Sequence, residues 1–377
     1  MPESLRHAFT VCICALVAAV AVAAAGAAPA SREAQLQQAL DGFVTSGFPG
    51  AVLLVRDGDR TYRLTSGVSD RSRRTPMRPS HRFRVGSVTK SLVATVILQL
   101  VAEGKLSLDD TVEERLPGLV PNGDGIKIRQ LLNHTAGLFD YLNDARILRP
   151  YAAGKLGHTW RPRELVARAV AHKPLFSPGA RFEYCNTCYV VLGLIVEKTS
   201  GRSLASELRR RIIGPLGLRG TSLPSSPQIP GAYAHGYSTQ LGANTPQDVT
   251  GISPTVTWAA GGLVSTADDL AVFYRALLGG RLLGADLLRT MEAGLRIGPL
   301  DDYGLGLWRT RSLALLSSAQ RLRCSAFWGH NGDWPGYHAD AFVTKDLTRQ
   351  VVLLVNGDVE GQPGPKFAQL ARLAYCG

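Results

Sequence analysis

The sequence predicts an α+β protein in which an antiparallel β-sheet is flanked by helices on both faces and adjoins a mainly helical lobe. Three observations support this fold. Strand pairs occur near both ends of the chain, the first and last segments have helical periodicity, and the middle is mostly helical pattern interrupted by glycine and proline. Strands from the two ends bury their apolar faces together if they join one sheet, with the terminal helices packed against it.

The amino-terminal elements are a helix and a strand pair. Residues 32–46 carry apolar side chains at three- and four-residue spacing, which predicts an amphipathic helix with one buried face. Residues 51–55 form a short apolar run, and residues 61–64 begin a return strand. Asp57-Gly58 between them is a turn signal, so we expect the two strands to form a hairpin.

The carboxyl-terminal elements show a similar pattern. Residues 337–343 and 350–355 are two apolar runs that flank the polar turn 345–348, which predicts a second hairpin. Residues 365–375 are typical of a closing helix.

The length of the chain predicts one unit with two lobes that share a cleft, because it exceeds what a single core usually serves. We expect this unit to span residues 31–376. The sheet lobe would contain residues 31–86 and 290–376, and the helical lobe would contain residues 91–280.

Residues 1–30 have the pattern of a signal peptide. Arg6 precedes an apolar run over residues 8–28, and a small-residue triplet ends at Ala30. The run approaches the length of a membrane-spanning helix, which is the competing interpretation. Its high alanine content favours cleavage near Ala30, because alanine gains little from lipid. We therefore expect a secreted or periplasmic protein without stable membrane insertion after processing.

The chain is basic, with a formal net charge of +12. Its bases are scattered among many acids, and the densest cluster, residues 71–74, has no interleaved aromatic residues. This pattern favours a solvated face over a nucleic-acid groove. A basic exterior is a weak argument for residence near anionic envelope polymers.

Ser87 and Lys90 begin the part of the sequence that carries chemistry. The pattern Ser-x-x-Lys opens an apolar segment, residues 91–101, which predicts a buried helix. Gly86 precedes the serine, so we expect its hydroxyl at the helix amino terminus, where developing negative charge is favoured. Burial would lower the pKa of Lys90 and make its amine a base toward the serine. A bare match more often marks a helix cap and a lysine that extends to solvent.

Two later motifs supply partners for this serine. Tyr184 and Asn186 precede a helical run, and His330 follows an apolar pair that predicts a strand edge. A serine, a lysine, a phenol and an imidazole together supply the nucleophile, base and proton relay of acyl transfer. His134, His338 and the other histidines lack metal-ligand spacing, so we expect structural histidines and neither a metal nor a cofactor.

The order Ser-x-x-Lys, Tyr-x-Asn, His-x-Gly resembles the serine D-alanyl-D-alanine carboxypeptidase and class C β-lactamase family, the penicillin-recognising serine hydrolases. Similar surroundings occur at residues 83–86, 133–138, 258–266 and 303–307, and the resemblance covers nearly all of residues 35–376. Within the family the chain is most similar to the secreted, His-x-Gly-type carboxypeptidases. The resemblance implies a β-lactamase/transpeptidase-like fold.

The resemblance also implies roles for the motif residues. Ser87 would attack and become acylated, with Lys90 assisting its deprotonation. Tyr184 would relay the proton to the leaving group and later activate water. His330 would orient and electrostatically support Tyr184, and Asn186 would hydrogen-bond the substrate amide.

The same resemblance places Trp258, Asn331 and Asp333 among the substrate-binding residues. The backbone N–H groups of Ser87 and Asp333 would form an oxyanion hole, because two preorganised donors stabilise the tetrahedral intermediate.

The substrate end departs from the family pattern. The carboxypeptidase has an arginine directly after its Gly-Leu-Gly-Leu segment, which binds a terminal carboxylate, and threonines beside the glycine of His-x-Gly. This chain has Trp308 and then Arg309, with Asn331 and Asp333 at the threonine positions. An acid at Asp333 disfavours a carboxylate and favours an amine, and Arg309 is expected on the opposite strand face.

The cysteines after residue 30 are Cys185, Cys188, Cys324 and Cys376, which allow three pairings. The resemblance implies a disulfide between Cys324 and Cys376, consistent with an oxidising compartment. Cys185 and Cys188 are expected to be buried thiols, and a redox pair is the alternative interpretation of their spacing.

Together these observations predict a serine hydrolase that forms an acyl-enzyme at Ser87, as a D-alanyl-D-alanine carboxypeptidase or a related D-amino-acid peptidase or amidase. An esterase or β-lactamase on the same scaffold is the nearest alternative. A non-catalytic penicillin-binding envelope protein is the alternative of a different class, and the intact relay argues against it. We expect a monomer that acts on small peptide or peptidoglycan-derived substrates, is acylated by β-lactams and binds no nucleic acid.

Overall fold

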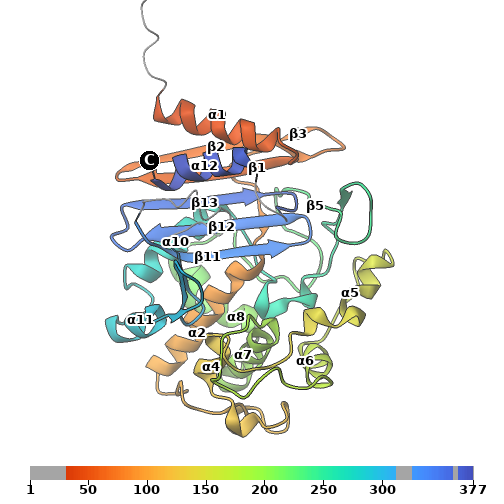
Figure 1. Ribbon diagram of the computed structural model, residues 1–377, viewed down its shortest axis with the longest axis vertical. Coiled ribbons are helices and arrows are strands. Elements are labelled where there is room, and N and C mark those ends of the chain that lie inside the picture. Colours follow the sequence, from red (N-terminus) through yellow and green to blue (C-terminus); the bar gives the residue numbers. More distant parts are fainter. Residues whose placement is uncertain (1–30, 311–324, 360–363, 377) are drawn as a thin grey trace, which may run out of the picture.

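The computed structural model describes residues 31–310, 325–359 and 364–376. Its centre is a nine-stranded antiparallel sheet with the strand order β3-β2-β1-β13-β12-β11-β10-β9-β8 (Figure 1). These strands are β1 (Gly50–Asp57), β2 (Arg60–Asp70), β3 (Thr75–Pro76), β8 (Leu295–Arg296), β9 (Asp301–Tyr303), β10 (Trp308–Thr310), β11 (Phe327–Trp334), β12 (Tyr337–Thr344) and β13 (Arg349–Val355). Two small pairs lie outside it: β4 (Phe83–Arg84) with β7 (Val264–Ser265), and β5 (Tyr237–Ser238) with β6 (Gln247–Asp248).

The two predicted hairpins lie side by side in this sheet. Strand β1 pairs with β2 on one side and with β13 on the other, with Ala51 opposite Val355. The amino- and carboxyl-terminal strands therefore meet in one sheet, which confirms the predicted fold class.

The helices divide between the sheet and a separate lobe. They are α1 (Arg32–Val44), α2 (Thr89–Ala102), α3 (Val112–Arg115), α4 (Ile128–Leu132), α5 (Ala145–Ala152), α6 (Pro162–Val170), α7 (Asn186–Ser200), α8 (Leu204–Leu208), α9 (Gly214–Leu216), α10 (Ala267–Leu278), α11 (Ala285–Glu292) and α12 (Pro365–Cys376). Among the described residues, none of these helices has the length and apolar character that a membrane span requires.

Alternating side chains of β1 serve two cores. Leu53 and Val55 pack with α1 and α12, which cover the outer face of the sheet, whereas Val52 and Leu54 join the core on the side of the helical lobe (Figure 1). This alternation follows from the two-residue period of a strand, and it explains why β1 is an almost continuous apolar run.

Helix α10 covers the inner face of the sheet. It contacts β1, β12 and β13 through buried residues that include Phe273, Tyr274 and Leu277. These residues were expected in the helical lobe, because helical periodicity shows that one face is buried but not what it is buried against.

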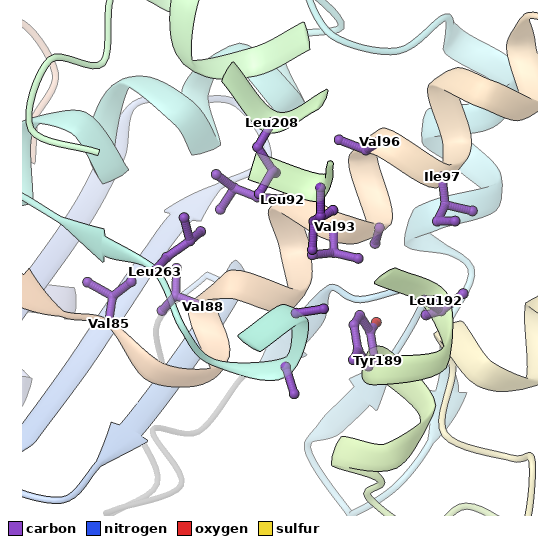
Figure 2. Packing of buried hydrophobic residues seen from close by; sticks show 14 of the residues in the cluster. Val85, Val88, Leu92, Val93, Val96, Ile97, Tyr189, Leu192, Leu208 and Leu263 are labelled. Atoms are coloured by element: carbon purple, nitrogen blue, oxygen red, sulfur yellow. The ribbon is translucent and has the colours of Figure 1, made fainter. Parts of the chain in front are cut away.

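Helix α2 is the buried axis of the helical lobe. Val93, Val96 and Ile97 are fully buried in the same cluster as Tyr189 and Leu192 of α7 (Figure 2). Because α2 is held by apolar side chains around most of its circumference, the residues at its amino terminus have a fixed position between the lobe and the sheet.

Candidate active site

Ser87 lies in the short 3₁₀ turn η1 (Gly86–Val88), directly before α2. Two glycines allow this turn to approach β11 closely. Gly86 has a φ of +49°, and a Cβ there would lie 2.4 Å from the carbonyl oxygen of Asp333. A Cβ at Gly332 would lie 2.8 Å from the Ser87 nitrogen. The backbones of Ser87 and Asp333 are therefore adjacent, as the predicted oxyanion hole requires.

Lys90 is completely buried, and its Nζ has three hydrogen-bond partners. They are Ser87 Oγ at 2.9 Å, Asn186 Oδ1 at 2.8 Å and the Ala260 carbonyl oxygen at 2.8 Å. Burial lowers the pKa of Lys90 to about 7, against the opposing effect of Asp140. A neutral amine donates two hydrogens, to Asn186 and Ala260, and its lone pair accepts the Ser87 proton. The geometry thus suits Lys90 as the base.

Asp140 holds Asn186 in place. Its Oδ2 accepts from the Asn186 backbone N–H at 3.0 Å and from the Asn186 Nδ2 at 2.8 Å, which leaves Oδ1 of Asn186 facing Lys90. Asn186 thus binds the base and also lines the cavity over Ser87, and its expected hydrogen bond to the substrate amide stays a prediction. Asp140 was not predicted from the sequence, because its only signal was its place shortly after the family-like residues 133–138.

Tyr184 faces the same serine. Its Oη interacts with the Ser87 hydroxyl, and the Lys90 Nζ lies 4.7 Å from the centre of its ring. Burial raises the pKa of Tyr184 despite the opposing effect of that hydrogen bond. The phenol is therefore protonated at neutral pH and suits a proton donor better than a general base.

His330 takes part in a buried hydrogen-bond chain behind Tyr184. Its Nε2 lies 2.9 Å from the Tyr303 hydroxyl, and that hydroxyl lies 3.1 Å from Nε2 of His134. Nδ1 of His134 accepts from the Cys185 backbone N–H at 3.1 Å. These hydrogen bonds connect β11, which carries His-x-Gly, to the segment before α7, which carries Tyr-x-Asn.

The partners fix the direction of every hydrogen bond in this chain. His330 Nδ1 faces the Asn331 carbonyl oxygen, which only accepts, so Nδ1 carries the proton. Burial lowers the pKa of His330 to about 3 and also lowers that of His134, so both rings are neutral. Tyr303 therefore donates to His330 and accepts from His134.

This arrangement changes the expected role of His330. A neutral imidazole supplies no positive charge to Tyr184, and its direct partner is Tyr303, while the rings of Tyr184 and His330 are 6.4 Å apart between centres. Tyr303 was not predicted as a site residue and entered only as part of the 303–307 match, and His134 was expected to be purely structural.

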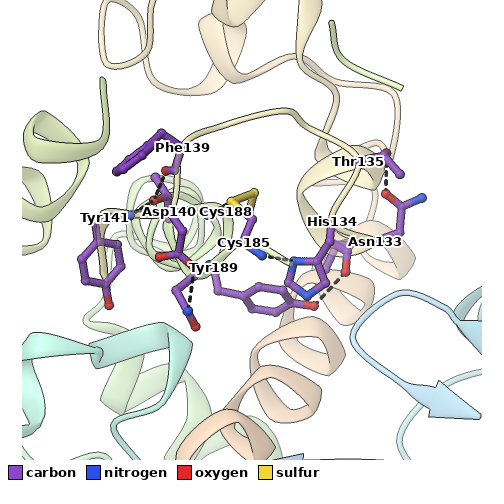
Figure 3. Close-up of a disulfide and its surroundings, with 12 residues drawn as sticks. Asn133, His134, Thr135, Phe139, Asp140, Tyr141, Cys185, Cys188 and Tyr189 are labelled. Carbon is purple, nitrogen blue, oxygen red and sulfur yellow. Dashed lines mark hydrogen bonds between the residues drawn. A yellow bond between two sulfur atoms is a disulfide. The ribbon is translucent and has the colours of Figure 1, made fainter. Parts of the chain in front are cut away.

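A disulfide joins Cys185 and Cys188 across the first turn of α7 (Figure 3). The expectation of two buried thiols is wrong, because the helical turn brings their Cα atoms to 5.4 Å, within the range that a disulfide spans. The bond lies directly beside Tyr184 and Asn186 in the chain. Cys324 lies outside the described residues, so its pairing with Cys376 stays a prediction.

A cavity of about 430 Å³ opens over the serine. Its described lining consists of Ser87, Leu142, Phe182, Tyr184, Asn186, Thr257, Ala260, Gly261, Ile297, Trp308, Asn331 and Asp333. The structure thus brings Asn331 and Asp333 to the nucleophile, but it does not bring Trp258 into the described lining. The indole of Trp258 instead packs on Gly193 of α7, where a Cβ would collide with it.

Asp333 is the one charged residue in the described lining of this cavity. Its Oδ1 lies 2.6 Å from His338 Nδ1, and His338 Nε2 lies 3.4 Å from Asp340. Burial opposes the charge of His338, but Asp340 and Asp333 outweigh it and raise the pKa of His338 to about 10. Burial also opposes the charge of Asp333, yet His338 lowers its pKa, so the carboxylate is ionised.

Arg309 does not supply a cation to the cavity. Its guanidinium binds Asp302 at 2.6 Å and lies 5.3 Å from the ring centre of Trp328. Trp308, the preceding residue, lines the cavity, so the two side chains lie on different faces of β10, as strand alternation requires.

The sequence pattern of the β-lactamase family matches residues 34–375, almost the whole chain. The chain belongs to the β-lactamase family. It is accordingly a hydrolase of the penicillin-recognising serine type, with the fold that the resemblance implied.

This β-lactamase family member is similar in sequence or structure to proteins with different named activities. A D-stereospecific amidohydrolase from Streptomyces sp. is 37% identical, with 91% of this chain and 98% of that chain covered and a TM-score of 0.81. A D-amino acid amidase from Ochrobactrum anthropi SV3, solved with L-phenylalanine amide, is 26% identical, with 91% and 98% covered and a TM-score of 0.79. Esterase EstB from Burkholderia gladioli is 29% identical over 366 residues, 87% of this chain and 91% of that protein.

Proposed function

We propose that this protein hydrolyses amides of D-amino acids, or peptides that begin with one, and that the substrate keeps a free α-amino group. The observation that carries this proposal is the charge of the cavity. Asp333 is ionised, and the described lining contains no cation for a terminal carboxylate. A carboxylate near Asp333 would be repelled, whereas an ammonium group would be attracted.

Two similarities support the amide and the D configuration. The Streptomyces protein is named a D-stereospecific amidohydrolase and the Ochrobactrum protein a D-amino acid amidase, and each match covers 91% of this chain. Among the activities predicted from sequence, this favours the amidase or aminopeptidase over the D-alanyl-D-alanine carboxypeptidase, whose substrate ends in a carboxylate.

The proposed reaction begins when neutral Lys90 accepts the Ser87 proton and Ser87 Oγ attacks the amide carbonyl. The oxyanion is stabilised by the backbone N–H groups of Ser87 and Asp333. Protonated Tyr184 then donates to the leaving nitrogen, the C–N bond breaks, and Lys90 returns a proton to Tyr184. Lys90, neutral again, then accepts a proton from the water that attacks the acyl carbon, and the proton passes to Ser87 Oγ as the D-amino acid leaves.

A comparison of D-phenylalanine amide with its N-acetyl derivative tests the amine preference. Asp333→Asn should lower kcat/KM for the free amine by about 10-fold and leave the N-acetyl substrate unchanged, because an ionic hydrogen bond at a half-exposed site contributes about 1–2 kcal/mol. Asp286→Asn, which removes an exposed carboxylate on α11, is the matched control and should change neither value. An equal loss for both substrates would contradict the proposed role of Asp333.

Ser87→Ala tests the nucleophile itself. It should abolish hydrolysis and covalent labelling by a fluorescent penicillin, and labelling that survives would remove Ser87 from the mechanism.

An esterase is the second candidate, because EstB is similar over most of both chains. Apart from Asp333, the described lining of the cavity carries no charge and would accept a short acyl ester. Turnover of p-nitrophenyl acetate that exceeds turnover of every D-amino-acid amide would favour the esterase.

We also propose export of the protein after cleavage near Ala30, and a Cys324–Cys376 disulfide in the exported form. The alanine-rich segment within residues 1–30 supports export. Mass spectrometry of the mature protein tests both proposals, since retention of residues 1–30 would contradict cleavage. A free thiol at Cys376 would contradict the disulfide.

A further inference from the structure

A second cavity, of about 390 Å³, lies between α10 and the ends of β1, β2 and β13. The sheet register separates it from the catalytic pocket. Gln350, which lines this cavity, is paired with Val343 on β12, and Val343 is paired with Trp328 on β11, so these residues form one cross-strand row. Asp333 of the catalytic pocket belongs to another row, in which it is paired with His338, and His338 is paired with Val355. Along β11 the two rows are five residues apart, which is about 17 Å of strand. The cavity is therefore not a subsite of the catalytic pocket.

Four arginines line this cavity, and its described lining holds a single carboxylate. That carboxylate, Asp268, is already bound by Arg63 at 2.8 Å. Arg275 donates to the carbonyl oxygen of Leu347. No ion pair joins Arg56, Arg275 or Arg281 to a carboxylate among the described residues, so three positive charges share one cavity without compensation.

The strand pattern directs these charges into the cavity. Val52 and Leu54 of β1 face the core beneath α10, and Arg56 continues the same face. Arg63 on β2 is paired with Leu54 and Thr61 is paired with Arg56, so both also line the cavity. The inner face of the sheet thus changes from apolar to cationic along β1, from Leu54 to Arg56.

The cations are close enough to repel one another. Burial lowers the pKa of Arg275, and the charge of Arg56 lowers it further. Beside them Gln350 is almost fully buried; its Nε2 donates to the Ala271 carbonyl, while its Oε1 has no hydrogen-bond partner among the described residues. The unbalanced positive charge raises the free energy of the empty cavity, and a polyvalent anion would lower it.

We propose that this arginine-lined cavity binds an anion with several adjacent phosphate groups, as in an oligophosphate or a phosphodiester-linked polymer. Guanidinium groups bind phosphate oxygens in pairs and keep their charge at every physiological pH. Three uncompensated guanidinium groups in one cavity match consecutive phosphates better than a single carboxylate. Such a site would retain the protein on an anionic polymer while the catalytic pocket stays open.

Calorimetric titration of the full mature chain with inorganic tripolyphosphate tests the proposal. The double variant Arg56→Gln/Arg281→Gln should weaken binding at least about 10-fold, because each lost ionic hydrogen bond costs about a factor of 5 or more. The matched control Arg163→Gln/Arg219→Gln removes two exposed arginines outside the cavity and should change affinity less than about 2-fold. Equal weakening in both double variants, or no binding by the wild type, would overturn the proposal.

Two further measurements separate this site from other effects. Orthophosphate should bind far more weakly than tripolyphosphate if several phosphates are recognised, and equal affinities would overturn that part of the proposal. Vesicles of phosphatidylglycerol should compete poorly, because a cavity does not admit a flat membrane surface; displacement of tripolyphosphate by vesicles would indicate a lipid site instead. Hydrolysis of a small ester by the cavity variants should be unchanged, so this test does not depend on the proposed substrate.

Discussion

The titration of Lys90 sets the pH at which the protein can be acylated. With a pKa of about 7, half of the Lys90 side chains are neutral at pH 7. A lysine with the ordinary pKa of 10.5 would be neutral in about 1 of 3,000 molecules at that pH. Burial of Lys90 therefore increases the fraction of neutral base by about 1,500-fold, which corresponds to roughly 4 kcal/mol in the free energy of deprotonating Lys90.

The assay is kcat/KM for p-nitrophenyl acetate, a substrate without a titrating group, from about pH 5 to about pH 9. We expect a tenfold rise per pH unit below about pH 6 and a plateau above about pH 8. A rise that continues toward pH 10, or a profile that is level throughout, would refute the assignment of Lys90 as the base.

Asp140→Asn should shift the pH dependence of kcat/KM in a known direction. The charge of Asp140 favours the ammonium form of Lys90, so its removal should lower the pKa of Lys90 and move the rising limb toward lower pH. Asp109→Asn, at an exposed carboxylate, should leave the limb in place. A shift toward higher pH in Asp140→Asn would contradict the electrostatic argument.

Three further predictions concern the surroundings of the serine. Gly332→Ala would place a methyl group 2.8 Å from the Ser87 nitrogen, so labelling by fluorescent penicillin should slow by about 100-fold, and unchanged labelling would exclude the close approach of β11. Tyr303→Phe should lower the free energy of unfolding in urea by about 2 kcal/mol, because it removes the hydrogen bonds of the Tyr303 hydroxyl to the two buried histidines. An unchanged urea midpoint would show that these hydrogen bonds do not stabilise the fold. The pKa of His338 is raised from 6.5 to about 10, so its contribution to the free energy of unfolding is complete below about pH 6.5 and is lost as pH rises toward 10. Urea unfolding of the wild type should therefore show a lower stability at about pH 10 than at about pH 6.5, and His338→Asn should lack this difference.

The sequence predicted those parts of the site that depend on local spacing. Ser87 and Lys90 are three residues apart, and one helical turn is sufficient to bring their side chains together. Tyr184 and Asn186 likewise belong to one short segment beside α7. The hairpins and the terminal helices could be predicted because the period of their apolar residues is local.

The groups that the sequence did not predict act over long separations. Asp140 binds Asn186 and Tyr303 binds His330, and neither pair has a spacing that marks it as a contact. Trp258 lies in a family-like segment, but its side chain faces α7, since Gly193 has no Cβ to occupy the space of the indole. A motif therefore identified the segment correctly but not the direction of the side chain.

The pairing of β1 with β13 has a consequence for the order of folding. Ala51 and Val355 are neighbours in the sheet although most of the chain lies between them, so the sheet closes only after the last hairpin is available. Until then the apolar edge of the first hairpin is unpaired, and long-range antiparallel pairing of this kind is slow and open to association between chains. Refolding should therefore depend more on the concentration of the chain than on the stability of the helical lobe, and substitutions in β13 should reduce the yield of soluble protein before they affect catalysis.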